Sequence, residues 1–144
     1  MDYQRRGYAK TTLFFLEDYP EVVGFLSVSP KALICEEFAR HLPKRERPTW
    51  TQIPAVYIAY AGVHRDFQGG FGVGEEIHTR LLRQLLQGFI GPRWLFLHVY
   101  RENPSVRFWE RLGYEFLDAD RSVPRRDNEE RELLRLVLDL KGQE

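Results

Sequence analysis

A run of glycines between two regular segments is the first part of the chain whose residue types suit chemistry. Residues Val63–Gly74 read VHRDFQGGFGVG, with four glycines in the last six positions. Glycine has no Cβ, so a ligand can approach the backbone amides of such a loop closely. An amphipathic segment follows at once, and the free N–H groups and dipole at the start of a helix favour an anion. The loop therefore predicts a pyrophosphate site, although a glycine-rich turn that binds nothing has the same composition.

Two common nucleotide-binding loops do not fit this stretch. A P-loop ends in Gly-Lys-Ser/Thr, whereas Gly74 is followed by two glutamates. A Rossmann loop normally opens its domain and is followed by an acidic residue after the second strand. Here three strand-like segments precede the loop, and the next one ends at Tyr100-Arg101. The loop is thus expected to belong to another class of fold.

The segments before the loop predict strands. Thr11–Glu17 and Val22–Val28 are rich in β-branched and aromatic residues and flank a turn at Pro20, which favours an antiparallel hairpin. Ser29-Pro30 is expected to interrupt the second strand, with an extension after a bend. The nearly continuous apolar run Ala55–Val63 predicts a strand covered on both faces.

The segments after the loop alternate between helix and strand. Glu75–Gln87 has apolar residues at helical spacing, and Gly88 stands where that helix would stop. The remaining expected elements are a strand at Trp94–Tyr100, a helix at Pro104–Leu112, a strand at Tyr114–Leu117, a polar loop at Ser122–Glu130 and a strand at Leu133–Leu140. This order, β-β-β-α-β-α-β-β, predicts one α/β (α+β) domain over residues 1–144 with a mixed sheet and helices on its faces.

Composition narrows the class of protein. The chain has 144 residues, 43% of them hydrophobic and 14% aromatic, and a formal net charge of zero. It therefore has enough apolar residues for one core, and no overall charge that would draw it to nucleic acid or membrane. Cys35 is the only cysteine, so no internal disulfide can form. The sequence has no apolar run long enough to span a bilayer, and we expect a cytoplasmic protein.

A second motif lies about 30 residues beyond the loop. Leu95–Asn103 is strand-like, and Ser105–Tyr114 reads SVRFWERLGY. Together with Ile58–Leu86, these segments resemble the acetyl-CoA-binding motifs of the GCN5-related N-acetyltransferase (GNAT) superfamily, with its Gln/Arg-x-x-Gly-x-Gly loop and its FYEKLGF-like ending. The resemblance covers roughly residues 11–140. It implies a mostly antiparallel twisted sheet with helices on both faces and a V-shaped split between the strand ending at Val63 and the strand ending at Tyr100.

The resemblance also implies the cofactor and its site. Acetyl-CoA would lie in the split, with its pyrophosphate on the loop and its pantetheine arm along the strand that ends at Val63. The residues expected to bind it are Gly62, Val63, Gln68, Gly69, Gly70, Phe71, Gly72, Val73, Gly74, Asn103, Ser105, Phe108 and Trp109. No metal is expected.

Three positions depart from the family pattern. The loop is one residue longer, and we place the extra residue near Phe71, with Gly72 and Gly74 as the paired glycines. Only about ten residues precede Thr11, which predicts a shortened N-terminal part. Trp109 stands where the family commonly has the tyrosine that acts as general acid, and an indole N–H does not usefully ionise.

The catalytic groups stay open between several candidates. The family often has a glutamate on the strand before the loop, where this chain has tyrosine, isoleucine and alanine. Tyr60, His64, His98 or a water chain remain as a base, with a structural role as the alternative for both histidines. Tyr100, at the end of its strand, is the candidate acid, unless the thiolate leaves unassisted.

Three functions follow from these features. The first is an acetyltransferase acting on a small-molecule, protein or peptide amine, in a protein that forms a possible homodimer. The second is a GNAT-type toxin that acetylates aminoacyl-tRNA, in which the basic loop Lys44–Arg47 would serve the RNA. That loop and the basic pair Arg125-Arg126 are equally compatible with solvated loop charges, and Trp50 beside the loop could be an aromatic residue of a substrate loop. The third, suggested by Trp109, is a non-catalytic acyl-CoA-binding module.

Overall fold

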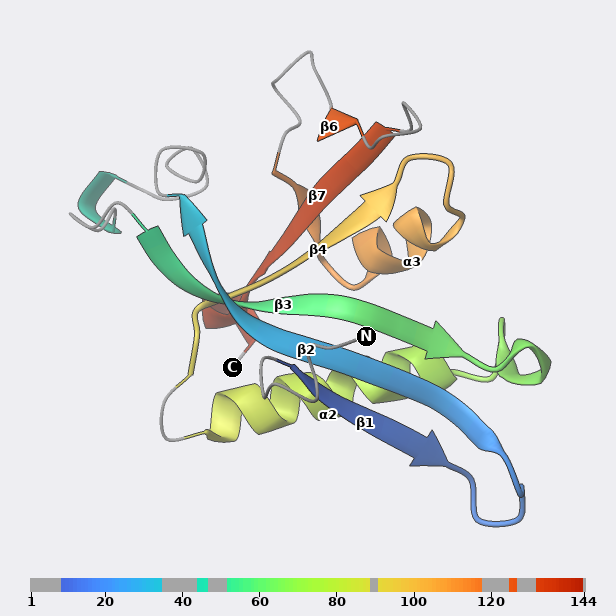
Figure 1. The fold of residues 1–144 in the computed structure, drawn as a ribbon. Coiled ribbons are helices and arrows are strands. Elements are labelled where there is room, and N and C mark those ends of the chain that lie inside the picture. The colour runs from blue at the N-terminus through green and yellow to red at the C-terminus, as the bar shows by residue number, and fades with distance from the viewer. Residues whose placement is uncertain are drawn as a thin grey trace.

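The protein is described from a computed structural model, which covers residues 9–34, 44–46, 52–88, 91–117, 125–126 and 132–143. The elements are β1 (Lys10–Phe15), β2 (Val22–Ile34), η2 (Lys44–Glu46), β3 (Gln52–Val63), η3 (Arg65–Phe67), α2 (Val73–Gln87), β4 (Trp94–Tyr100), α3 (Ser105–Arg111), β5 (Glu115–Phe116), β6 (Arg125–Arg126), β7 (Glu132–Asp139) and η4 (Leu140–Gln143). Figure 1 shows the described strands as one twisted sheet, together with the helices α2 and α3. The predicted fold class, an open mixed sheet with helices, is confirmed.

Seven strands form the sheet. Their order is β1-β2-β3-β4-β7-β5, and β6 pairs with β7 beside this path. Every pairing is antiparallel except that of β3 with β4, which is parallel. The two parallel strands join through α2, as a crossover between parallel strands requires.

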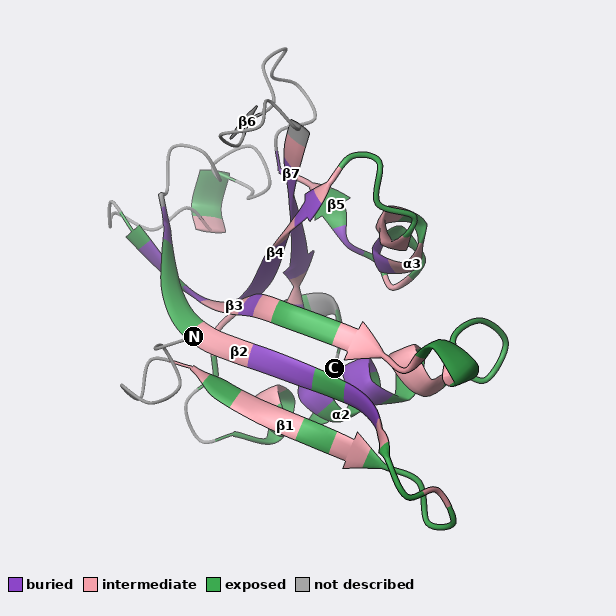
Figure 2. Cartoon of the chain, turned by 45° about the vertical axis from the view of Figure 1, so that its right-hand side comes forward, coloured by how far each residue is buried: buried purple, intermediate pink, exposed green. Residues whose placement is uncertain are grey.

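Two hydrophobic clusters cover the two faces of the sheet. Leu95, Leu97 and Leu136 point to one face, where they pack with residues of both α2 and α3. Phe96 and Val137 alternate with them and point to the other face, in a cluster that takes no residue from either helix within the described part of the chain. Figure 2 shows the result, with β4 and β7 buried along most of their length, whereas β1, at the edge of the sheet, alternates between exposed and intermediate residues. A central strand buried on both faces reads as a continuous apolar run, as β4 does.

The break that the sequence predicts at Ser29-Pro30 is wrong, because β2 continues through it to Ile34. Val28 is opposite Lys10, where β1 begins, so among the described residues β2 pairs only with β3 beyond Val28. A proline that lacks its N–H is tolerated on a strand with one open side. The predicted polar loop at Ser122–Glu130 also needs correction, since Arg125–Arg126 form the short strand β6. The helical turn expected near Phe38 lies outside the described residues.

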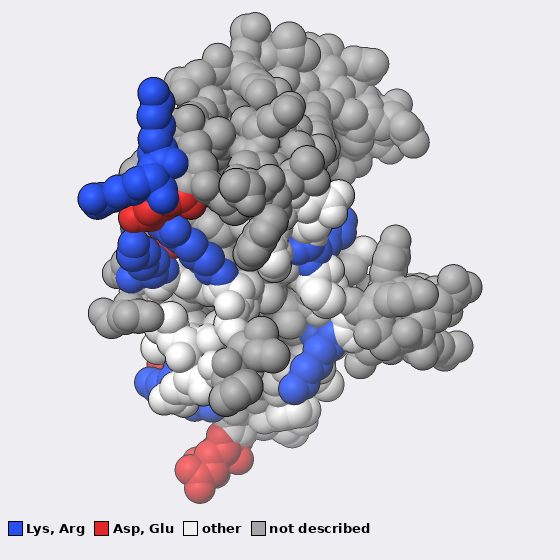
Figure 3. Space-filling view, turned by 90° about the vertical axis from the view of Figure 1, so that its left-hand side faces the viewer, with Lys and Arg blue, Asp and Glu red and all other residues white. Residues whose placement is uncertain are grey.

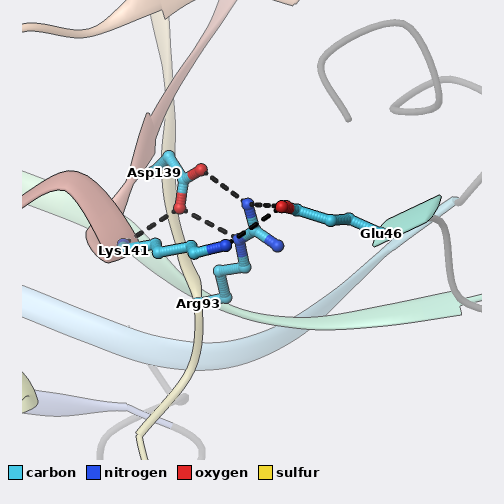
Figure 4. A network of polar contacts seen from close by, with 4 residues as sticks. All are labelled: Glu46, Arg93, Asp139 and Lys141. Carbon is cyan, nitrogen blue, oxygen red and sulfur yellow. Dashed lines mark hydrogen bonds and ion pairs between the residues drawn. The ribbon is translucent and has the colours of Figure 1, made fainter. Parts of the chain in front are cut away.

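Charged residues gather where β4 begins. Figure 3 shows basic side chains around acidic ones on this side of the molecule. Arg93 forms two hydrogen bonds to the carboxylate of Asp139, at 3.1 and 2.9 Å, and a third to Glu46 at 2.9 Å (Figure 4). The ammonium of Lys141 lies 3.0 Å from the other oxygen of Glu46. Hydrogen bonds from Lys141 and Arg93 lower the pKa of the Glu46 carboxyl.

We predict that Arg93→Lys lowers the free energy of unfolding by about 1–2 kcal/mol, because a lysine keeps the charge but cannot bridge two carboxylates with a planar fork. Urea unfolding at pH 7 measures the change. The matched control is Arg65→Lys, at a side chain that is 90% exposed beside Asp66, with an expected effect within about 0.5 kcal/mol. Equal effects of the two substitutions would show that the network of Arg93 contributes nothing specific.

Candidate functional site

The site begins where β3 and β4 separate. The two strands pair in parallel over only four residue pairs, from Ala55–Trp94 to Ile58–Leu97. Beyond them β3 runs on to Val63 and β4 to Tyr100 with no pairing between the two. A cavity of about 850 Å³ lies in this gap, lined by both strands, the glycine loop and the first turns of α2 and α3. The split predicted from the sequence is therefore confirmed.

A β-bulge in β3 lies at the mouth of the split. Val28 is opposite Ile58 but Ser27 is opposite Tyr60, so Ala59 is an extra residue on β3. The bulge reverses the alternation of side chains, as bulges do. Ile58 and Val63 both pack on the side of the helices, whereas Tyr60 and Gly62 point to the opposite face. Backbone groups of Ala59 to Val63 line the cavity along this stretch.

The glycine loop has the backbone that its sequence suggests. Gly69, Gly70 and Gly72 have φ angles of +67°, +58° and +72°, a region that other residues rarely adopt. A Cβ built on any of the three would meet nothing within 4 Å, so the space above them is open. The side-chain amide of Gln68 donates a 2.8 Å hydrogen bond to the carbonyl of Val63, which ties the start of the loop to the end of β3.

The glycine loop ends at the start of α2, where no side chain caps the backbone N–H groups. Gly72 is the N-cap residue. The N–H groups of the first turn of a helix have no partner within that helix, and Gly72, Val73 and Gly74 all line the cavity. Glu75 and Glu76 lie in this first turn. Glu76 is paired with Arg80 at 3.0 Å, while Glu75 lines the cavity.

Gly74 has a different role from the one that the family pattern implies. A Cβ on Gly74 would lie 3.0 Å from the ring of Phe108 and 3.7 Å from Val63. The missing side chain thus lets α2 approach α3 closely. Phe108 in turn lies edge-on to Trp109, with ring centroids 5.1 Å apart.

Nearly all residues predicted from the sequence to hold a cofactor line the cavity. Phe71 is the exception: its side chain is 67% exposed and lies outside the lining, with its ring 5.9 Å from that of Phe67. The carbonyl oxygen of the Asn103 side chain accepts a 2.9 Å hydrogen bond from the N–H of Ser105. Asn103 therefore already satisfies one amide at the start of α3, and its side-chain oxygen is committed to the protein.

Three of the candidate catalytic residues, Tyr60, His98 and Tyr100, line the cavity. His98 points to the face away from the helices, where its Nδ1 lies 3.0 Å from the hydroxyl of Tyr57. Burial raises the pKa of Tyr57, so this hydroxyl is neutral at physiological pH. His98 thus has a structural partner and also a place in the cavity wall.

His64, the other histidine candidate, lies outside the cavity lining. Its Nδ1 accepts a 3.2 Å hydrogen bond from the N–H of Asp66 at the start of η3, and its Nε2 lies 3.4 Å from Glu21. The structural role is therefore the one that the geometry supports for His64.

A buried polar pair beside Trp109 was not predicted. The Nε2 of His78, on α2, lies 2.9 Å from the hydroxyl of Tyr114. Both side chains are buried, and Trp109 packs edge-on against Tyr114 at 5.3 Å. Burial lowers the pKa of His78 to about 4 and raises that of Tyr114. The pair spans 36 residues of sequence, and no local pattern points to it.

The described residues hold no group of three or more histidine, cysteine, aspartate or glutamate side chains suited to a metal ion. Among the same residues, no helix is long and apolar enough to cross a membrane.

Comparison with known proteins places the fold. No protein-family model and no curated protein matches the sequence. A solved structure described as a bacterial toxin matches with a TM-score of 0.76 at 14% identity, over 98% of this chain and 73% of that one. Arabidopsis thaliana NAA60 with a bisubstrate analogue matches with a TM-score of 0.67 at 16% identity, over 96% and 79%.

A third match is AtaT complexed with acetyl-methionyl-tRNAfMet, with a TM-score of 0.64 at 18% identity, over 98% of this chain and 76% of that one. These identities establish the fold and nothing finer. The chain has the GNAT fold, as the resemblance of its two motifs predicts.

We predict that His78 makes stability depend on pH. Its pKa is about 4 when folded, below the ordinary 6.5, so the unfolded chain takes up a proton first. The contribution of neutral His78 to the free energy of unfolding is complete above pH 6.5. It is lost as the pH falls toward 4, to a total of about 3 kcal/mol. Urea unfolding between pH 7 and 4.5 should therefore show a smaller pH dependence in His78→Gln than in the wild type. Parallel curves for the two proteins would contradict this.

Proposed function

We propose that this protein is an acetyl-CoA-dependent N-acetyltransferase that acts on a primary amine. The observation that supports it most is the cavity of about 850 Å³ in the split, which is continuous with the glycine loop and the uncapped start of α2. One end of the cavity would offer backbone amides to a pyrophosphate, and the other end lies between β3 and β4. Structures with this fold include NAA60 in complex with acetyl-CoA.

Acetyl-CoA fits the residues that are present. The open space above Gly69, Gly70 and Gly72 leaves room for phosphate oxygens beside the backbone. Ala59 to Val63 line the cavity beyond the last pairing of β3 with β4, and their backbone would hold the amide-rich pantetheine arm by strand-like hydrogen bonds. Glu75, at the rim, is the one described carboxylate in the cavity wall, and its charge would oppose the anion.

The cofactor supplies an activated acetyl group as a thioester. The amine nitrogen forms a bond to the carbonyl carbon, the carbon–sulfur bond breaks, and its electron pair leaves on sulfur. Overall the amine gives up a proton and the sulfur gains one. The protein contributes mainly by holding the two reactants together, which alone supplies a large part of many rate enhancements.

Two side chains on β4 are the proposed proton carriers. His98 is the proposed base, because it lines the cavity and the Tyr57 hydroxyl, 3.0 Å from its Nδ1, helps to orient the ring. Tyr100 is the proposed acid, since it lies at the open end of the strand in the cavity wall. Trp109, in the position of the usual tyrosine, is buried among rings.

A toxin that acetylates aminoacyl-tRNA is the alternative, and a panel assay separates the two. The exposed Lys44 and Arg45 adjoin Glu46, which is hydrogen-bonded to Arg93 at the start of β4, whereas the cavity is at the other end of that strand. Glu46 and Asp139 offset part of the positive charge there. Release of CoA would be followed with small amines, peptides and aminoacyl-tRNA. We expect turnover with an amine that carries no RNA, and binding of acetyl-CoA without any turnover would favour a non-catalytic module.

The pyrophosphate site is tested by a pair of variants at one glycine. Asn and Asp both tolerate the left-handed backbone of Gly70, and both would point into open space. We expect Gly70→Asp to bind acetyl-CoA about five- to tenfold more weakly than Gly70→Asn, because only Asp adds a charge like that of the phosphates. Isothermal titration calorimetry at low salt measures the difference. Equal affinities of the two variants would place the pyrophosphate elsewhere.

The proton carriers are tested by turnover. Tyr100→Phe should lower kcat by about 10²-fold or more if the hydroxyl protonates sulfur, with Tyr19→Phe, outside the cavity lining, as the matched control. His98→Gln should cause a similar loss and remove the acidic limb of the pH–rate profile. Losses of only a few-fold would mean that the thiolate leaves unassisted and that positioning dominates.

A further inference from the structure

A second cavity lies between the edge strand β1 and the second half of α2. Its volume is about 370 Å³, within the range of pockets that take small molecules. It is lined by residues of β1 between Lys10 and Phe14, by Leu26 and Val28 of β2, and by residues of α2 between Arg80 and Gln87. Figures 1 and 2 both show α2 running beside β1 along this edge of the sheet. We call this cavity the edge groove.

The floor of the edge groove is apolar. Phe14, Leu26, Val28 and Leu81 all belong to the hydrophobic cluster on the helix side of the sheet. Leu26 and Leu81 are buried, whereas Phe14 and Val28 are only partly buried, so the cluster is incompletely covered at this edge. A ligand that covered these side chains would remove apolar surface from water, which is favourable.

Cations line two walls of the groove. Lys10 lies on β1, and Arg80 and Arg83 lie on α2, three residues apart and therefore on one face of the helix. No aspartate or glutamate is among the described residues that line the groove. Arg80 is paired with Glu76 at 3.0 Å, but neither Lys10 nor Arg83 has an ion pair with a described carboxylate. The groove is therefore positively charged in a chain whose formal net charge is zero.

Floor and walls together select one class of ligand. The cations would repel a positively charged molecule, and a molecule without charge would gain nothing from them. A guanidinium group suits a carboxylate or a phosphate, to which it can donate two parallel hydrogen bonds. Gln84 and Gln87 add side-chain amides to the helix wall of the groove. An anion that carries an apolar body would satisfy both the walls and the floor.

We propose that the edge groove binds a small amphiphilic anion, with a carboxylate or phosphate head on an aliphatic or aromatic body. The head would lie between Lys10 and Arg83, and the body would cover Phe14 and Val28. Among the described residues, Leu26 alone lines both the groove and the cavity in the split, so the two sites are separate but share one side chain. The proposal is independent of the proposed acetyltransferase activity.

Matched probes test the site on the full chain. Octanoate, octyl phosphate and octylammonium have the same alkyl chain and differ in the head. We expect at least one of the two anions to bind about tenfold or more tightly than octylammonium, because the groove attracts only anions. Octanoate should also bind about tenfold or more tightly than butanoate, because a longer chain removes more CH₂ groups from water. Calorimetry at low salt measures the affinities, and the tighter of the two anions identifies the preferred head.

Variants of the walls and the position of the ligand complete the test. Arg83→Met and Lys10→Met each remove a charge and keep an unbranched apolar side chain. Each should weaken binding of octanoate by about three- to tenfold at low salt. The matched control is Arg107→Met, at an exposed arginine of α3 that lines neither cavity, with an expected change below about twofold. Amide shifts in nuclear magnetic resonance should concentrate at residues 10–14 and 80–87 as octanoate is added.

Four outcomes would overturn the inference. Failure of both anions to bind would mean that the cations of the groove are only solvated surface charges. Equal affinity for octanoate and octylammonium would mean that the charge of the walls selects nothing. Amide shifts confined to residues 58–63 and 97–103, with unchanged affinity in Arg83→Met, would place the anion in the split instead. A wild-type dimer that Arg83→Met dissociates in sedimentation would assign the groove to a second copy of the chain.

Discussion

The separation of β3 from β4 after four residue pairs is the constraint on which the rest of the structure depends. Two strands that part inside a sheet leave backbone N–H and C=O groups without partners, and such groups must be satisfied by water or a ligand. The strands separate next to a deeply buried part of the sheet, which stabilises the fold against the free-energy cost of these groups. Leu95, Leu136 and Val137 are almost completely buried on the two faces where β4 pairs with β7. Arg93 then ties the start of β4 to Asp139 and Glu46, where β3 and β4 still pair.

Three glycines serve this arrangement in three different ways. Gly70 has a positive φ and open space above it, so it leaves room for a ligand. Gly74 lets Phe108 of α3 approach α2, which narrows the helix side of the cavity. Gly62 lets the Phe25 ring lie over β3 on the other side. The bulge at Ala59 adds to this, because it turns Tyr60 away from the core and brings Val63 back toward the helices. A glycine pattern in sequence therefore has several causes.

Local sequence predicted the elements well, and contacts between distant residues account for what it missed. The helix of Val73–Gln87 and the strand of Trp94–Tyr100 follow from periodicity and apolar content, and the second motif predicted where they lie. The continuation of β2 through Pro30 depends on its pairing with β3 beyond Lys10, where β1 begins, and no residue near Pro30 specifies that pairing. The pairing of His78 with Tyr114 likewise depends on how α2 meets the chain after α3. The cavity lining was predicted through the family resemblance, and the role of Gly74 was not.

The region around Trp109 limits the chemistry that the cavity can support. Its indole packs against Tyr114, whose hydroxyl is hydrogen-bonded to His78, and burial keeps both members of that pair neutral by lowering the pKa of His78 to about 4 and raising that of Tyr114. A neutral imidazole and a phenol with a raised pKa are poor proton donors to a thiolate, since each would leave a buried charge behind. The pair therefore anchors α2 to the segment after α3. The proposed proton carriers, His98 and Tyr100, lie instead at the end of β4 where β3 and β4 have already separated, and both line the cavity.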